Sequence, residues 1–495
     1  NNTVASTASA AGSSIVGSGN TVNATNALVL ANTAAVTGAG AIAIGNTVSV
    51  TGSDAIAIGN NVAAIATDAI AIGHNSAATG AFSAAYGSFS FASGSESSAY
   101  GVESAATGDQ SSAYGVASIA SGFASSAYGS FSTASGDFSA AYGVNTQALA
   151  ANSIAIGGSL TSNDAASVDS TSANGIAIGN QSHISAASAN SVAVGFNNSV
   201  TGANSGAFGT GQVINGTGSF GFGDPNTING NGSFVLGDNN TINGPNTAGN
   251  GDTINVVGSN NTVASTASAA GSSIVGAGNT VNGTNALVMA NAATVTGAGA
   301  IAIGNTVSVT GSDAVAIGNN TSANFANSVA IGNGATVTRA NQQAFGTASN
   351  TYTMAGITSA ASKAAQSGPV EIVTSDAGGN LATSTLAGLG LASSSTISTI
   401  NSQLASINGR IDDLYTRSSK AYNGVAMAFA MAGVPTLMPG EKLAMTMNYG
   451  TFEGASGLAL NAAFRLTDAM QLTGGIGYGA NEHIAGGRVG LRMAW

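Results

Sequence analysis

Small and apolar residues alternate along most of the chain in short runs that end at regularly spaced glycines. The runs 42–44, 56–58 and 70–72 each read Ile-Ala-Ile, and the glycines that follow such runs recur every 14 residues from Gly45 to Gly157. A further glycine often stands seven residues earlier, so the unit predicts two strands of about five residues, each closed by a turn. Such units bury a face only by stacking on one another. The pattern therefore predicts a mostly β fold, a β-solenoid or β-roll over residues 1–346.

Alternation places the two outer residues of each run on one face and the central alanine on the other. Between Gly87 and Gly143 the last residue of the run becomes tyrosine, from Tyr86 to Tyr142, while the first becomes alanine or serine. This exchange is typical of volume conservation in a shared buried layer. We therefore expect a stacked tyrosine ladder inside the head, with its hydroxyls reaching a polar partner. A ladder exposed for ligand contact is the alternative.

Two other positions of the repeat hold mostly polar residues and are expected to face water. They lie five residues before the glycine and two residues after it. In the middle repeats these positions become phenylalanine: Phe82, Phe89, Phe131 and Phe138. Exposed phenylalanines on a polar surface indicate an adhesive patch. Burial between neighbouring subunits is the competing interpretation.

Two longer features favour a structural role. Residues 195–260 are rich in asparagine, which turns explain without a metal ion, so no metal or cofactor site is expected. Residues 2–61 recur at 261–320 with 54 of 60 positions identical. Copying such a block lengthens a stack without disturbing a site, which favours a structural protein over an enzyme.

The repeats stop after Gly346, and the next segments differ from them. Residues 347–395 predict a connector with a strand near 370–375 and a turn at 376–380. Residues 396–420 predict a coiled-coil stalk, because apolar residues there alternate at spacings of three and four and isoleucine at both core positions favours more than two strands. A core helix of a globular domain is the alternative. The predicted coiled-coil core comprises Ile397, Ile400, Leu404, Ile407, Ile411 and Leu414.

Four segments between 443 and 495 alternate with period two. Their apolar face includes Leu443, Met445, Met447, Tyr449, Leu458, Leu460, Phe464, Val489, Leu491 and Met493. The opposite face includes Gly450, Gly475, Gly477 and Gly490. This alternation is typical of outer-membrane barrels, where the apolar face contacts lipid and the other faces the pore.

Four strands cannot close a barrel, and open sheet edges do not occur in lipid, so several chains must pool their strands. Three chains give twelve strands. Residues 421–434 predict a helix of small residues that packs with its copies inside the pore, and Pro435 ends it. We therefore expect a membrane anchor over residues 421–495. The pore-facing glycines either leave space in the pore for export of the rest of the chain or allow the helix to pack closely against the strands.

Composition and charge narrow the function further. Charged residues make up 6% of the chain, cysteine is absent and only three histidines occur, so we expect no catalytic site and no enzyme. Residues 1–338 contain twelve acidic residues and no lysine or arginine, which excludes nucleic acid as a partner there. The sequence does not open on a basic and then apolar segment, so we expect a signal peptide to have been removed or trimmed.

The head repeats, the heptads and the segment from about Arg410 to Trp495 together resemble the trimeric autotransporter adhesins of the YadA-like type. The resemblance implies a homotrimer with a left-handed parallel β-roll head, a short trimeric coiled-coil stalk and a twelve-stranded outer-membrane β-barrel. It implies that the barrel-assembly machinery recognises Trp495, and that the head is exposed on the cell surface.

The function implied by this resemblance is adhesion to host cells, extracellular matrix or other surfaces. The ligand is expected to be a matrix protein, a glycan or an abiotic surface. The chain's own barrel would anchor it and assist its export, as in type V secretion. Residues 347–395 depart from the family, because its neck motif is not evident there. A phage-type trimeric receptor-binding fibre is the alternative function.

Overall fold

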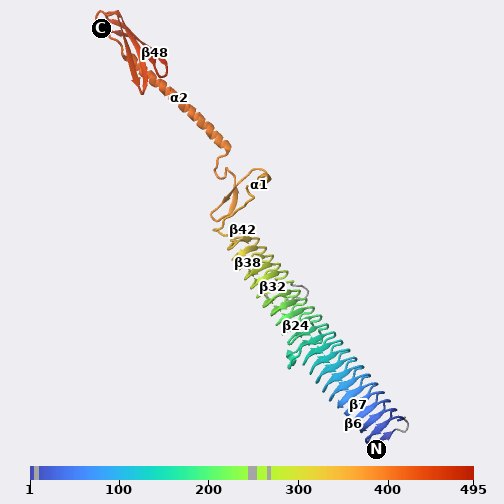
Figure 1. Cartoon of the computed structure of the whole chain (residues 1–495). Helices are drawn as coiled ribbons and strands as arrows, with labels where there is room; N and C mark the ends of the chain where they lie inside the picture. The colour runs from blue at the N-terminus through green and yellow to red at the C-terminus, as the bar shows by residue number, and fades with distance from the viewer. Residues whose placement is uncertain (5–9, 244–252, 265–268) are drawn as a thin grey trace. The chain divides into compact units, whose positions relative to one another are not determined.

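The computed structural model describes residues 1–4, 10–243, 253–264 and 269–495. It forms two compact units, Asn1–Thr351 and Tyr352–Trp495. The first unit is a parallel β-solenoid, as predicted, and its strands β1 to β42 belong to one continuous system (Figure 1). Successive coils pair in register at the 14-residue period, so that Tyr100 pairs with Tyr114 and Ala106 with Ala120.

Each coil contributes one strand to a first column, which contains the runs that precede the glycines, and one to a second column. The first-column strands are β2 Ser14–Val16, β4 Leu28–Asn32, β6 Ile42–Val50, β7 Ile56–Ala64, β8 Ile70–His74, β10 Ala84–Tyr86, β12 Ser98–Tyr100, β14 Ser112–Tyr114, β16 Ser126–Tyr128, β18 Ala140–Tyr142, β20 Ile154–Ile156, β22 Ile176–Ile178, β24 Val192–Phe196, β26 Gly206–Thr210, β28 Phe220–Gly223, β30 Phe234–Leu236, β32 Asn255–Ser259, β34 Ser273–Ala277, β36 Leu287–Asn291, β38 Ile301–Asn305, β40 Val315–Asn319, β41 Val329–Ile331 and β42 Gln343–Phe345. Strands β6 and β7 continue into the second column.

The other second-column strands are mostly two residues long. They are β1 Thr3–Val4, β3 Thr21–Val22, β5 Ala35–Val36, β9 Ala77–Ala78, β11 Phe91–Ala92, β13 Ala105–Ala106, β15 Ile119–Ala120, β17 Thr133–Ala134, β19 Gln147–Ala148, β21 Ser167–Val168, β23 His183–Ile184, β25 Ser199–Val200, β27 Val213–Ile214, β29 Asn226–Ile228, β31 Asn240–Ile242, β33 Thr262–Val263, β35 Thr280–Val281, β37 Thr294–Val295 and β39 Ser308–Val309. A 3-10 turn, η1 Ser162–Asp164, lies between β20 and β21.

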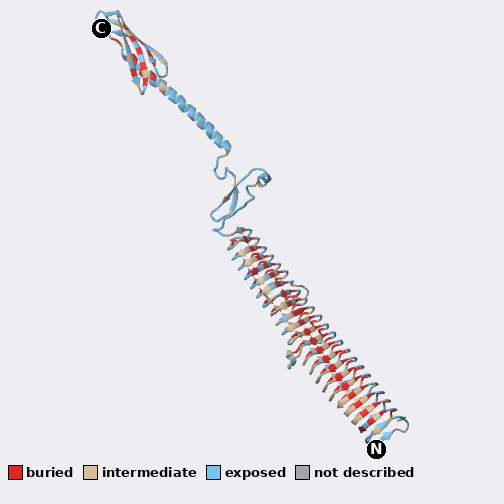
Figure 2. Cartoon of the chain, viewed as in Figure 1, coloured by how far each residue is buried: buried red, intermediate tan, exposed pale blue. Residues whose placement is uncertain are grey.

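The prediction that the isoleucines of the Ile-Ala-Ile runs and the tyrosines fill the interior of their coils is wrong. The central alanines Ala43 and Ala113 are completely buried, whereas Ile42 and Ile44 are only half-buried. Tyr142 is exposed. In these coils the small central residue fills the interior, and the larger residues of the first column point outward. Figure 2 shows the buried residues as a line inside the stack.

A second correction concerns the asparagine-rich segment, where some asparagines are buried in the interior rather than placed in turns. The Nδ2 of Asn240 donates to the Oδ1 of Asn226 at 2.9 Å and to the carbonyl of Gly258 at 2.7 Å. The Oδ1 of Asn240 accepts from the backbone and side-chain amides of Asn261 at 3.0 and 2.9 Å. We call this chain of amides, which stabilises successive coils, the amide ladder: Asn198, Gln212, Asn226, Asn240, Asn261 and Asn279.

The second unit begins with the short helix α1 Ala360–Ala365 and a hairpin of β43 Ile372–Ser375 and β44 Leu381–Ser384. The hairpin turn is fixed by Asp376, whose Oδ1 accepts from the backbone amide of Asn380 at 2.9 Å. A single helix, α2 Ser394–Ala432, then runs through both the predicted stalk and most of the predicted pore helix. Four antiparallel strands complete the unit: β45 Leu443–Phe452, β46 Ala455–Thr467, β47 Met470–Gly479 and β48 Ile484–Met493.

The C-terminal part of α2 packs on one face of this sheet. Ala426 and Ala430 are completely buried, and the side-chain amide of Asn461 donates to the carbonyl of Ala430 at 3.2 Å. A Cβ at Gly450 would lie 2.5 Å from the carbonyl oxygen of Ala426, so glycine is required for the helix to approach. No helix in the described ranges is long and apolar enough to cross a membrane.

Candidate adhesive surface

The four predicted adhesive phenylalanines are exposed at turns that connect the strand columns. Between 53% and 60% of the surface of each one is accessible, and each has a positive φ of 57–60°. Phe89 and Phe131 occupy the turn that follows the first-column strand, here called turn A. Phe82 and Phe138 occupy the turn that precedes it, here called turn B. Both turns require the left-handed backbone conformation at this position.

Phenylalanine is a poor choice for this conformation. A left-handed backbone costs a bulky L-residue roughly 1–2 kcal/mol, whereas asparagine and aspartate tolerate it. Other coils follow that preference, with Asn75 and Asn145 in turn A and Asp68 and Asn152 in turn B. The phenylalanines gain little burial in return, so folding of the single chain does not explain them.

The four phenylalanines do not form one contiguous patch. Turns A and B bound opposite ends of the first-column strand, and residues 82 and 138 are four coils apart, roughly 19 Å at the usual strand spacing. Instead, each end carries local aromatic contacts. The ring of Phe138 meets that of Phe123 edge-on at 5.2 Å, and the ring of Phe89 meets His74 at 5.6 Å. Phe123 is not among the predicted adhesive residues, and only the coil geometry places it beside Phe138.

The tyrosine ladder is stacked as predicted, although it lies outside the coil. Ring centroids from Tyr86 to Tyr142 are separated by 4.5–5.2 Å, with interplanar angles of 2–13°. Partial burial raises the pKa of the Tyr100 hydroxyl above its usual value, and the neighbouring Tyr86 and Tyr114 raise it further. Partial burial likewise raises the pKa of Tyr114, and the neighbouring Tyr128 raises it further.

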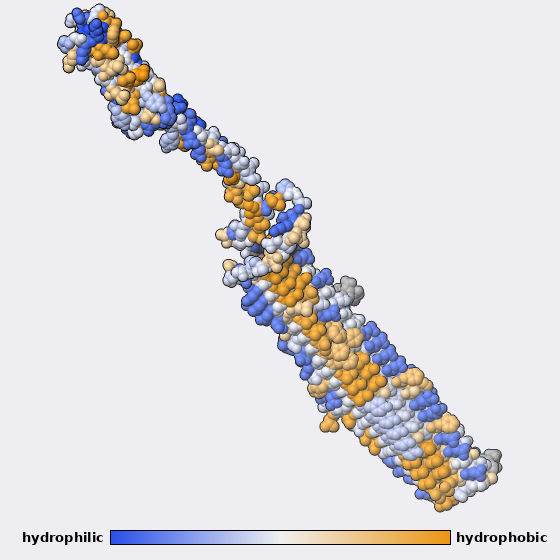
Figure 3. Space-filling view, turned by 45° about the horizontal axis from the view of Figure 1, so that its top comes forward, coloured by the Kyte–Doolittle hydropathy of each residue, from blue (hydrophilic) through white to orange (hydrophobic). Residues whose placement is uncertain are grey.

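The ladder is one section of a longer apolar stripe on the outward face of the first strand column. Half-buried or exposed residues such as Ile58, Ile156, Leu236 and Met289 continue it in other coils. Figure 3 shows a hydrophobic stripe along the visible face of the stack, interrupted by a paler section. The larger apolar side chains of this face thus remain accessible in the single chain.

The predicted coiled-coil core also lies open along α2. Between 42% and 61% of the surface of each of its six residues is accessible: Ile397, Ile400, Leu404, Ile407, Ile411 and Leu414. The hydroxyl of Ser393 accepts from the backbone amide of Thr396 at 3.1 Å and caps the start of the helix. These six residues, here called the seam, therefore lie on a well-capped helix and have no partner within the described chain.

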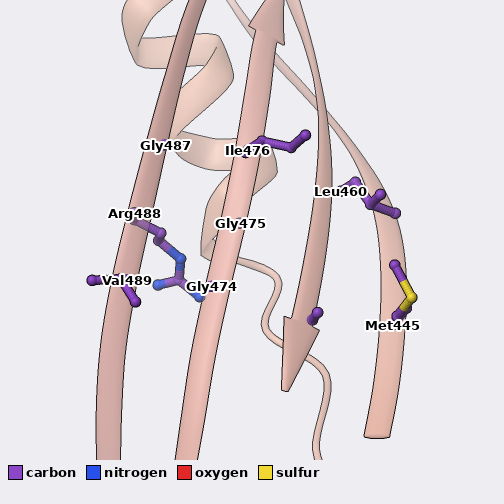
Figure 4. A pocket seen from close by; sticks show the side chains of 9 residues that line it. Met445, Leu460, Gly474, Gly475, Ile476, Gly487, Arg488 and Val489 are labelled. Carbon is purple, nitrogen blue, oxygen red and sulfur yellow. The ribbon is translucent and has the colours of Figure 1, made fainter. Parts of the chain in front are cut away.

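The four-stranded sheet exposes one apolar face, opposite α2. All ten predicted lipid-facing residues lie exposed on it: Leu443, Met445, Met447, Tyr449, Leu458, Leu460, Phe464, Val489, Leu491 and Met493. This face contains a shallow hollow of about 590 Å³ beside Gly474 and Gly487, with Met445, Ile476 and Val489 at its margin (Figure 4).

The predicted pore-facing glycines differ in what surrounds them. A Cβ at Gly450 or Gly477 would collide with α2, the latter 2.4 Å from the Cγ of Met427. A Cβ at Gly475 would collide with Asn461, and one at Gly490 would lie 3.0 Å from the Oγ1 of Thr473. Packing within the chain therefore explains Gly450 and Gly477 without reference to export. Trp495 is fully exposed.

No model of a known protein family matches this chain. Within the described residues, no group of three or more histidine, aspartate or glutamate side chains is placed to hold a metal ion. The site is therefore a set of exposed aromatic and apolar surfaces.

Proposed function

We propose that this protein is a bacterial surface adhesin, a homotrimer of the trimeric autotransporter type, in which turns A and B present phenylalanines to a ligand. The observation that carries the proposal is the set of exposed phenylalanines in left-handed turns. They lower the stability of the single chain and bury little surface within it. Local conflicts of this kind concentrate at functional sites.

Three unpartnered apolar surfaces support the trimeric assembly. The stripe on the solenoid, the seam on α2 and the outer face of the sheet each expose large side chains that a soluble monomer would leave in water. A seam with isoleucine at both core positions favours assemblies of more than two helices. Association of identical chains would cover the stripe and the seam together.

The sheet supports membrane anchoring by pooled strands. Its four strands present an apolar outer face, and the outer edges of β45 and β48 have no strand partner within the described chain. Three copies would supply twelve strands and leave no open edge in lipid. In this arrangement α2 lies inside the barrel, and Trp495 is the signal for the barrel-assembly machinery.

Replacement of Phe82, Phe89, Phe131 and Phe138 by asparagine tests the adhesive role. Asparagine suits the left-handed turns, so each change should raise the free energy of unfolding by up to about 1 kcal/mol. Attachment of cells that display the variant to matrix-coated or plastic surfaces should fall severalfold.

The matched control replaces Glu96, Glu103, Gln110 and Ala117, which occupy the same two turns, by asparagine. Control cells should attach as the parent does. Unchanged attachment by the phenylalanine variant would contradict the adhesive role, and a variant that no longer folds would show that these rings are structural. Recovery of the native protein without detergent would favour the receptor-binding fibre.

A further inference from the structure

The 14-residue period is interrupted between Gly157 and Gly195, and the strand stack stays intact there. Gly157 and Gly179 are 22 residues apart, and Gly179 and Gly195 are 16 apart. Strands β20, β22 and β24 nevertheless pair in register, as do β21 and β23. The additional residues are therefore confined to the turns, where rigid scaffolds commonly carry binding residues.

Two of the widened turns, at 169–173 and 185–189, are tied to one another by hydrogen bonds. The Oγ1 of Thr171 donates to the Oδ1 of Asp169 at 2.9 Å and accepts from the backbone amide of Ala187 at 2.7 Å. The Oγ of Ser172 accepts from the backbone amide of Ser188 at 2.9 Å. This network holds the turns in one arrangement before any ligand arrives, which lowers the entropic cost of binding.

A hollow of about 320 Å³ opens beside these turns on the outward face of the second strand column. Three successive coils line it with Gln147, Ser167 and His183, and Leu149 and Asp169 flank them. The Oγ of Ser167 lies 2.7 Å from the Nδ1 of His183. Among the described residues, neither the side-chain amide of Gln147 nor the Nε2 of His183 has a hydrogen-bond partner. Both remain available to a ligand.

The hollow disfavours anionic ligands. Asp169 lines it, and Asp164 lies close by, where its carboxylate accepts from the hydroxyl of Thr161 and from the Nε2 of Gln181 at 2.8 Å. These hydrogen bonds hold the pKa of Asp164 below its usual value, so the carboxylate stays charged at neutral pH. No lysine or arginine occurs before residue 339 to offset either charge.

A Ser-His-Asp hydrolase is the competing interpretation of these residues. It needs an acidic side chain bonded to the imidazole, since that group orients the histidine and stabilises its charged form. Within the described residues, the imidazole of His183 bonds only to Ser167. The cluster therefore favours binding over catalysis.

We propose that this hollow binds one unit of a neutral saccharide, a proposal that rests on the adhesin function. The amide of Gln147, the imidazole of His183 and the carboxylate of Asp169 match the alternating donors and acceptors of sugar hydroxyls. The side chain of Leu149 offers an apolar surface to the C–H face of the ring. Pockets with a few fixed polar groups beside apolar ones are typical of small-ligand sites.

The test uses the full-length protein in detergent on an array of neutral glycans, with sialylated and sulfated forms of the same glycans beside them. The parent should bind a neutral glycan, and Gln147→Ala and His183→Ala should each weaken that binding about tenfold, as expected for loss of one or two hydrogen bonds to a ligand. Thr133→Ala and Ser199→Ala are the matched controls, because both lie in the same outward column one coil beyond the hollow.

Three outcomes would overturn the proposal: no neutral glycan bound, equal losses in the variants and the controls, or a preference for the sialylated or sulfated forms. Thermal unfolding of each variant establishes that its fold is intact. Cell attachment measured in parallel separates the two proposals. Attachment without glycan binding leaves the adhesin function standing and removes only the saccharide site, whereas absence of any attachment removes the adhesin function.

Discussion

Two regions of the solenoid, the tyrosine coils at residues 84–148 and the asparagine coils at 192–242, share one backbone but distribute their large side chains differently. In the tyrosine coils the interior holds only small residues such as Ala113 and Ser118, while the aromatic rings lie outside. In the asparagine coils the interior holds Ile214, Ile228 and the amide ladder. The same coil backbone thus presents large side chains for contact at the surface in one region and packs them in the interior, where they stabilise the fold, in the other.

The volume of the residues inside the coil explains how one backbone accommodates both distributions of large side chains. Gly221 faces the large residues of the asparagine coils, where an added Cβ would lie 2.8 Å from the Cδ1 of Ile214 and 3.3 Å from that of Ile228. In the tyrosine coils alanine occupies both positions. Three buried serine hydroxyls of the tyrosine coils, those of Ser111, Ser125 and Ser139, have no hydrogen-bond partner within the described residues, against that of Ser233 in the asparagine coils.

Truncation of Ile228 should produce the largest loss of stability. Ile228→Ala leaves a cavity between Gly221 and the neighbouring isoleucines, and should lower the free energy of unfolding by about 3 kcal/mol. The comparison variant is Ala120→Gly at the same position of a tyrosine coil, which should cost about 1 kcal/mol through backbone freedom alone. Hydrogen exchange of peptides that span each site measures both effects. Equal losses at the two sites would contradict the proposed difference in interior packing.

Interruption of the amide ladder should have the next largest effect. Asn240→Ala removes the acceptor of the Asn261 backbone amide and the side-chain donor to the carbonyl of Gly258, so a loss of about 2 kcal/mol is expected. The corresponding residue in a tyrosine coil is Ser118, whose hydroxyl makes one hydrogen bond, at 3.1 Å to the carbonyl of Gly115. Ser118→Ala should cost about 1 kcal/mol. The same hydrogen-exchange measurement checks the pair, and a smaller loss for Asn240→Ala would show that the ladder adds little.

The repeat period was sufficient to predict the solenoid, because glycine at a fixed spacing marks turns and alternation marks strands. Period-two alternation also separates two faces, but it does not say which face is inside. The exchange of isoleucine for tyrosine at one position of the run indicates a shared layer, but that layer lies on the outward face. Ala43 occupies the interior instead, and which face turns inward depends on how the two strand columns pack, which no local pattern contains.

The candidate site was predictable only in part. Exposure of Phe82 and Phe138 followed from the acidic and polar residues at the same position of other repeats. Their separation from Phe89 by the width of a coil could not be predicted in this way, because it depends on which turn each residue occupies. Similarly, Asn226 and Asn229 are close in sequence, yet only Asn226 enters the interior, where its Nδ2 donates to the carbonyl of Gly237 at 2.6 Å.

The smallest expected effect concerns ionisation of the tyrosine side chains in the tyrosine coils. The amide ladder of the asparagine coils contains no ionisable counterpart. The folded-state pKa of Tyr100 and Tyr114 is raised, so folding stabilises their protonated form. That stability is fully present below the usual tyrosine pKa of about 10 and is lost as the pH rises through the higher folded value. Absorbance at 295 nm should therefore show a late-ionising component, which the double variant Tyr100→Phe, Tyr114→Phe removes. Hydrogen exchange at alkaline pH should increase in the tyrosine coils before it increases in the asparagine coils. The reverse order would show that the outward rings contribute nothing to the stability of their own coils, and that the two regions differ only inside.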